Sequence, residues 1–177
     1  MKQILKPPVR QFLLKALIIY ILWYILYDLW MLPDGSVDHW LSHNMVVVSS
    51  SILHVIGYQV FAYGRNVGIS GTSGIRMLNG CNGLSTIGLF LGFIIAFPGD
   101  HWKRLWFSLA GILIIYLTNV MRITILTLII YWKPSYFNVT HEYTGSLVYY
   151  SIIFVLWMIW ANYGRNNRLL SQTVPSS

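Results

Sequence analysis

Four long apolar runs divide the chain, and polar or turn-forming segments separate them. The runs cover residues 12–32, 83–98, 105–132 and 145–163. A helix needs about 20 predominantly apolar residues to cross the ~30 Å hydrocarbon core of a bilayer, so the second run is close to the lower limit. Trp and Tyr gather at the ends of the runs, as they do at membrane interfaces. This pattern predicts an all-α integral membrane protein with about four transmembrane helices.

Residues 37–57 carry a different pattern, in which apolar side chains recur at spacings of 4, 3, 4 and 3. These apolar residues are Leu41, Met45, Val48, Ile52 and Val55. The opposite face carries polar residues, namely His39, Ser42, His43, Ser50 and His54. Such a periodicity predicts an amphipathic helix that lies in the plane of the outer membrane interface. The competing interpretation makes this segment a fifth transmembrane span.

The stretch from 58 to 80 is rich in Gly and Ser and contains short β-prone pieces between turn sequences. It predicts a small β-meander, which must lie outside the hydrocarbon because lipid does not tolerate open sheet edges. The polar tail over 165–177 is expected to be disordered. Residues 1–177 therefore form a single membrane domain.

Composition supports a lipid environment. Of the 177 residues, 56% are hydrophobic and only 10% are charged, whereas soluble domains carry about 25% charged residues. The net charge of +7 does not indicate nucleic acid binding, because the basic residues form no stripe. Eight of the twelve lie in small groups near the ends of the apolar runs, at Lys2, Lys6, Arg10, Lys15, Lys103, Arg104, Arg165 and Arg168.

Basic residues favour the cytoplasmic side of a membrane, and this preference fixes an orientation. If the chain crosses the membrane four times and the segment from 37 to 78 stays outside, each of these groups of basic residues lies on the cytoplasmic side. The arrangement predicts a multi-pass protein of the bacterial cytoplasmic membrane. Cys81, at the mouth of the second span, and His141, just before the fourth, then lie at the outer surface.

Cys81 is the only cysteine, and it stands directly before the second predicted span. The positive end of a helix dipole favours the thiolate form of a thiol. Asn82 and Gly83 follow it and are candidates for substrate binding, since a glycine lets a peptide backbone approach closely and the following amides could stabilise an oxyanion. The alternative is a buried, inert cysteine.

Arg122 lies within the third predicted span, where a charge is costly and is usually functional. Asn119 lies one turn earlier on the same face. Arg122 has two possible roles. It is a cation that binds an anionic group or stabilises the thiolate, or it forms with Asn119 a structural hydrogen-bonding pair that joins helices. His141 is a candidate general acid and base, with Glu142 as a neighbour that could orient it or contact substrate. The alternative for His141 is a polar residue of the membrane rim.

We expect no metal and no cofactor. His39 and His43 lie one turn apart, but the sequence offers no third ligand at a fixed spacing.

Taken together, three segments resemble the exosortase/archaeosortase family, and in particular its short forms of the Bacteroidetes type. They are Cys81-Asn82-Gly83, Asn119-Val120-Met121-Arg122, and His141 followed by Gly145. Their order and spacing match the family over about 37–163, although many exosortases have extra spans before this region. The resemblance implies that Cys81 forms a thioester, His141 acts as acid and base, and Arg122 assists the thiolate or oxyanion.

The resemblance also implies the reaction and the substrate. Family members are thought to cut a C-terminal sorting tail from membrane-anchored, exported proteins and to pass the new carboxyl end to an acceptor. Protease and transpeptidase both remain open, as does the oligomeric state. Two rivals also remain, a transporter or assembly subunit that binds a ligand through Arg122 and Asn119, and a thiol oxidoreductase that would need a partner thiol.

Overall fold

The computed structural model describes residues 7–143 and 147–164, and the predicted disordered tail over 165–177 lies outside them. The described chain is mostly helical with one small sheet, as predicted. Its elements are α1 (Pro7–Leu26), π-helical η1 (Tyr27–Met31), α2 (Leu32–Asp34), α3 (Ser36–Val55), β1 (Val60–Tyr63), β2 (Asn66–Ile69), β3 (Ile75–Arg76), α4 (Leu84–Ala96), α5 (His101–Trp132), 3₁₀-helical η2 (Pro134–Tyr136), α6 (Phe137–Tyr143) and α7 (Tyr149–Tyr163).

The described helices differ in their capacity to cross a membrane. Two segments, Val9–Asp34 and His101–Trp132, are long and apolar enough to do so. The helices α4 and α7 are also apolar, but they are shorter. The first of the long segments runs through α1, η1 and α2, so the predicted first helix continues as far as Asp34.

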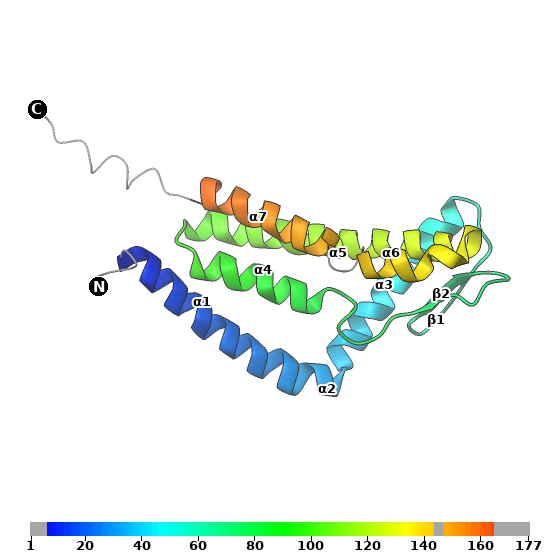
Figure 1. Ribbon diagram of the computed structural model, residues 1–177, viewed down its shortest axis with the longest axis horizontal. Helices are drawn as coiled ribbons and strands as arrows, with labels where there is room; N and C mark the ends of the chain where they lie inside the picture. Colours follow the sequence, from blue (N-terminus) through cyan, green and yellow to red (C-terminus); the bar gives the residue numbers. More distant parts are fainter. Residues whose placement is uncertain (1–6, 144–146, 165–177) are drawn as a thin grey trace, which may run out of the picture.

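A first hydrophobic cluster joins α4 and α7 to the first part of α5 (Figure 1). Its buried members are Phe90, Ile94, Ile115, Leu156 and Trp160. Aromatic rings fill the space between the helices, and the rings of Phe93 and Trp157 stack with centroids 4.6 Å apart. On the other side of α4, a Cβ atom at Gly88 would lie 2.0 Å from the ring of Trp23. Glycine at that position is what lets α1 approach α4 closely.

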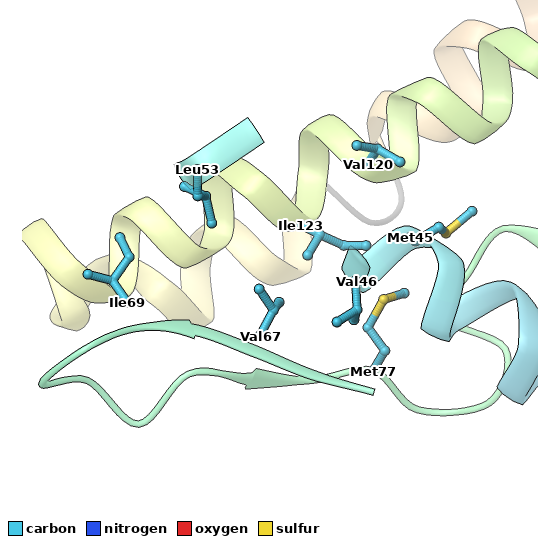
Figure 2. Packing of buried hydrophobic residues seen from close by; sticks show 8 residues of the cluster. All are labelled: Met45, Val46, Leu53, Val67, Ile69, Met77, Val120 and Ile123. Atoms are coloured by element: carbon cyan, nitrogen blue, oxygen red, sulfur yellow. The ribbon is translucent and has the colours of Figure 1, made fainter. Parts of the chain in front are cut away.

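A second hydrophobic cluster joins α3 and the sheet to the later part of α5 (Figure 2). Its buried members are Met45, Val46, Leu53, Val67, Ile69, Met77, Val120 and Ile123. The sheet is an antiparallel meander in the order β1-β2-β3, in which Val60 pairs with Ile69 and Asn66 pairs with Arg76. The alternation of β2 turns Val67 and Ile69 toward α5, so the sheet covers this half of the helix.

The amphipathic segment is a helix, but the prediction of which of its residues are buried is partly wrong. Val55, predicted to be on the apolar face, is 84% exposed, whereas Ser42 and Ser49 are fully buried. Small side chains let α3 pack tightly, and their hydroxyls are satisfied because Ser49 Oγ donates to the carbonyl of Val120 at 3.2 Å. The buried face therefore follows small polar residues as well as large apolar ones.

The two hydrophobic clusters meet on α5 between Ile115 and Val120. Figure 1 shows the consequence for the whole molecule: α1 begins and α7 ends at one end, while α6 and the sheet lie at the other. Asn119 and Arg122 lie at or just beyond this junction. On one side of them α5 packs against the helices α4 and α7, and on the other side it packs against α3 and the sheet.

Candidate active site

A cavity of about 580 Å³ lies between α1, α4 and α7. One part of its lining is polar or reactive and contains Asp28, Cys81, Arg122 and Tyr149. The rest is largely apolar and is formed by residues such as Ile19, Trp23, Leu89, Phe93, Ile153 and Trp157. The cavity therefore combines a reactive end with a long apolar wall, which suits a ligand that has both a polar group and an apolar segment.

The reactive thiol lies in a short loop between β3 and α4. Cys81 is free and half-buried, and its amide donates to the carbonyl of Leu78 at 3.2 Å to close a turn. Glycines flank it at Gly80 and Gly83, with φ angles of 78° and 77°, a conformation that residues with a Cβ rarely adopt. The loop thus turns sharply on both sides of the cysteine, and α4 begins directly after it at Leu84.

Asn82 and Asp38 connect this loop to α3 through buried hydrogen bonds. The Asn82 Nδ2 donates to Asp38 Oδ1 at 2.9 Å and to the Asp38 carbonyl at 3.2 Å, while Asn82 Oδ1 accepts from the Leu84 amide at 3.0 Å. The Gly80 amide donates to the same Asp38 Oδ1 at 2.8 Å. Both Asp38 and Asn82 are fully buried, so one carboxylate oxygen holds the residues on each side of Cys81.

Arg122 faces the cavity from α5, and Tyr149 and Asn119 support it. The Arg122 Cζ lies 5.6 Å from the centre of the Tyr149 ring, which is a cation–π contact. The Tyr149 hydroxyl donates to Asn119 Oδ1, and Asn119 Nδ2 donates to the Ile115 carbonyl at 3.3 Å. The Nε of Arg122 is buried and donates no hydrogen bond among the described residues. Because Arg122 lines the cavity, its guanidinium can meet an anionic group there.

His141 lies on α6, outside the lining of the cavity but within the electrostatic influence of Arg122. Its partial burial and the nearby guanidinium lower the pKa of its imidazole below the ordinary value of 6.5. The imidazole is therefore neutral at pH 7, which is the form that can accept a proton. Its side chain is largely exposed and stacks loosely on Phe137, with ring centroids 5.6 Å apart.

A thiol, a guanidinium and an imidazole whose pKa is lowered by that guanidinium are groups that suit acyl transfer. A family model described as transmembrane exosortase (Exosortase_EpsH) matches residues 6–158. The chain belongs to this family. The match covers most of the exosortase chain, including all three predicted motifs, and it identifies the chain as a membrane protein. No curated protein and no solved structure matches the chain.

The predicted site residues of this exosortase fall into two groups. Cys81, Gly83 and Arg122 line the cavity, whereas Asn82, Asn119 and His141 do not. Asn82 and Asn119 are fully buried and bind other protein groups. The backbone of Glu142 belongs to α6, but its side chain lies outside the described part of the structure.

Two residues of the site were missed in the sequence. Tyr149 was assigned to an interfacial belt because it lies at the end of an apolar run, yet only 8% of it is exposed. Asp38 falls within the predicted amphipathic helix over 37–57, but it is not among the site residues that the sequence predicts. The spacing of Asp38, Ser42 and Ser49 along one face of a helix could have indicated a buried polar stripe.

Among the described residues, no three His, Cys, Asp or Glu side chains gather closely enough to hold a metal ion. His43 instead lies 2.9 Å through Nδ1 from the carbonyl of Gly64. Because a carbonyl can only accept, Nδ1 carries the proton in that contact.

Proposed function

We propose that this exosortase is a membrane-embedded cysteine peptidase and transpeptidase that removes the C-terminal sorting tail of exported proteins. The observation that carries the proposal is that Cys81 and Arg122, from distant parts of the chain, line one cavity. Family membership supports a membrane sorting enzyme in general. The further steps, and the roles of individual residues, are our inference from the chemistry of this cavity.

In the first step, the Cys81 sulfur attacks the carbonyl carbon of the scissile peptide bond. His141 takes the thiol proton and delivers it to the amide nitrogen as the carbon–nitrogen bond breaks. The tail leaves as an amine, and the exported protein remains bound as a thioester. An acceptor nucleophile or water then attacks the thioester and releases Cys81, which recovers a proton.

Arg122 stabilises negative charge in this sequence. A guanidinium that lines the same cavity as the thiol can stabilise the oxyanion that forms when sulfur attacks. Tyr149 supports Arg122 through the ring contact, and Asn119 supports Tyr149 through the hydrogen bond described above. A nucleophile in the loop before α4 and a cation on α5, both lining one cavity, fit acyl transfer better than passive ligand binding.

The length of α5 supports an outer position for this chemistry. Its 32 residues rise about 48 Å at 1.5 Å per residue, well beyond the ~30 Å of the hydrocarbon core. If the helix enters the bilayer near His101, the core ends about 20 residues later, close to Arg122. The half of α5 beyond that point is covered by α3 and the sheet, as expected outside the lipid.

The orientation follows from charge. The start of α1, the end of α4, the start of α5 and the end of α7 lie at one end of the molecule (Figure 1). Basic residues gather there, at Arg10, Lys15, Lys103 and Arg104, which favours the cytoplasmic side. We infer four spans in the bacterial cytoplasmic membrane, with the cavity open toward the exterior and α3 and the sheet outside.

The cavity also favours a membrane-anchored substrate. Its apolar wall extends from Cys81 along α1 and α4 to Phe93 and Trp157. A peptide whose cleavage site directly precedes an apolar span would place that span against this wall. The apolar lining of the cavity would also limit the access of water to a thioester and so favour transfer over hydrolysis.

The test is co-expression of the chain with an exported protein whose C-terminus carries a short motif, an apolar segment and basic residues. Wild type should shorten the protein, and Cys81→Ala should abolish shortening while remaining inserted. Ser51→Ala, which removes one exposed hydroxyl on α3 that bonds only the Val47 carbonyl, is the matched control. Full shortening by Cys81→Ala would refute the proposal.

The orientation is checked in the same cells. Because Cys81 is the only cysteine, a membrane-impermeant maleimide should label it in intact cells. Labelling only after permeabilisation would place the cavity on the cytoplasmic side and contradict the inferred topology.

A further inference from the structure

We propose that Asp38 is a positioning residue that clamps the cysteine loop of the active site onto α3. The proposal rests on the function proposed above, since it assigns a purpose to the loop that carries Cys81. It goes beyond that function because Asp38 belongs to none of the three motifs. It also lies outside the cavity, so it acts through the loop and does not touch the substrate.

The first observation is the bonding of one oxygen atom. Asp38 Oδ1 accepts from the Gly80 amide at 2.8 Å, from Asn82 Nδ2 at 2.9 Å and from the Tyr27 hydroxyl at 3.4 Å. Two of these donors belong to the residues immediately before and after Cys81. Because both neighbours are tied to α3, the side chain between them is directed to the opposite side, where the cavity lies.

The second observation is the extent of burial. Asp38 is fully buried, and its other carboxylate oxygen, Oδ2, accepts no hydrogen bond among the described residues. A carboxylate in such a position is expensive to desolvate, and an apolar side chain would fill the same space at lower cost. The hydrogen bonds to the loop are the property that an apolar residue could not supply.

The third observation is that the clamp extends to neighbouring elements. Asn82 Oδ1 accepts from the Leu84 amide at 3.0 Å and so fixes the first residue of α4. Tyr27, the third donor to Asp38, stacks on Trp23 with ring centroids 5.4 Å apart and planes inclined by 7°. Trp23 itself lines the cavity. The carboxylate of Asp38 thus connects η1 and α3 directly, and the start of α4 through Asn82, around the thiol.

The chemical consequence is control of where the sulfur lies. Nucleophilic attack requires the sulfur within about 3–3.5 Å of the carbonyl carbon, and a displacement of 1 Å can reduce the rate about a hundredfold. Two positive-φ glycines flank Cys81, so the loop has little stiffness of its own. Asp38 supplies that stiffness from outside the loop.

The experiment compares Asp38→Asn, Asp38→Ala and Ser49→Ala in the full chain. The asparagine keeps Oδ1 as an acceptor for all three donors and replaces only the oxygen that accepts nothing. The alanine removes every acceptor. Ser49 is the control because it is buried on the same face of α3 and bonds α5 but does not touch the loop.

Two readouts are needed. A nitroxide attached to Cys81, the sole cysteine, reports the order of the loop by electron paramagnetic resonance without any substrate. The spectrum should be immobilised in wild type, Asp38→Asn and Ser49→Ala, and should gain a mobile component in Asp38→Ala. Substrate processing should stay near wild type in Asp38→Asn and fall about a hundredfold in Asp38→Ala, mainly in kcat.

Each result decides something. An immobilised label in folded Asp38→Ala would overturn the clamp, and so would a label in Asp38→Asn as mobile as in Asp38→Ala. If Asp38→Ala does not accumulate as folded protein, Asn82→Ala replaces it with the same expected mobility, and a rigid label there again overturns the proposal. The spectra do not depend on substrate, so failure of the proposed function, seen as processing by Cys81→Ala, remains distinguishable from failure of the clamp.

Discussion

The contact between Gly83 and Asn119 allows a sharp test of the site. A Cβ atom at Gly83 would lie 2.1 Å from Asn119 Nδ2 and 3.2 Å from its Cγ. The same residue has a φ angle of 77°, so alanine there is strained by its own backbone as well. Gly83→Ala must therefore displace Asn119, the residue that accepts the hydrogen bond of Tyr149.

The expected magnitude has two parts. A side chain in the left-handed conformation costs about 1–2 kcal/mol, and overpacking of a filled interior costs about 1–3 kcal/mol. The variant Gly80→Ala separates the backbone cost from the overpacking cost. Gly80 has nearly the same φ angle, 78°, but the nearest atoms to a Cβ there, in Leu32 and Tyr27, are 3.9 Å away. Gly80→Ala should therefore lose about 1–2 kcal/mol, and Gly83→Ala about 2–5 kcal/mol.

The assay is thermal unfolding of both variants, purified in the same detergent, together with substrate processing. For a chain of this size each kcal/mol corresponds to about 2–4 °C in the unfolding midpoint. Gly83→Ala should unfold several degrees below Gly80→Ala and should process substrate more slowly, because Asn119 no longer supports Tyr149 beneath Arg122. Equal midpoints for the two variants would refute the tight packing of Gly83 against α5.

Two further predictions concern the outer half of the molecule and the pH dependence. Leu53→Ala should lower the free energy of unfolding by about 2–5 kcal/mol, because Leu53 is fully buried. Val55→Ala, at a site that is 84% exposed, should change it by less than about 0.5 kcal/mol. Similar unfolding midpoints for the two variants would contradict the observed buried face of α3. Burial and the nearby Arg122 lower the pKa of His141 below 6.5. The imidazole should therefore be neutral above pH 6.5 and become protonated as the pH falls through the lowered pKa. The folded state should lose stability over the same range, because it binds this proton less readily than the unfolded state does. Arg122→Gln should raise the pKa of His141. When the processing rate is plotted against pH and normalised to its maximum, its decline at low pH should then begin at a higher pH than in wild type. An unchanged decline would exclude the influence of Arg122 on His141.

Much of the fold follows from local patterns. Apolar runs longer than ten residues become helices because a helix satisfies its own backbone hydrogen bonds, and the Gly-rich stretch after α3 forms a meander because turn residues separate β-prone pieces. The three motifs are weak one by one, but their order and spacing along the chain together resemble the family. These features depend on residues close in sequence, which is why they could be predicted.

The clamp could not be predicted, because it depends on packing between distant elements. Asp38 and Ser42 resemble a solvated helix face, since polar residues are usually exposed. Their burial requires that Asn82, far along the chain, present an amide to them. Val55 shows the converse, since an apolar residue at the end of a helical stripe is exposed when the neighbouring element does not extend to it.

The long helix α5 explains why the candidate site lies where it does. Its first part packs against α4 and α7, and its later part packs against α3 and the sheet. These two packings require different partners, so the neighbours of α5 must change between Ile115 and Val120, and a change of partners leaves space beside the helix. Polar groups are least costly at such a boundary because water and hydrogen-bonding partners are close. Arg122 therefore occupies the part of α5 where a charge and a cavity can coexist.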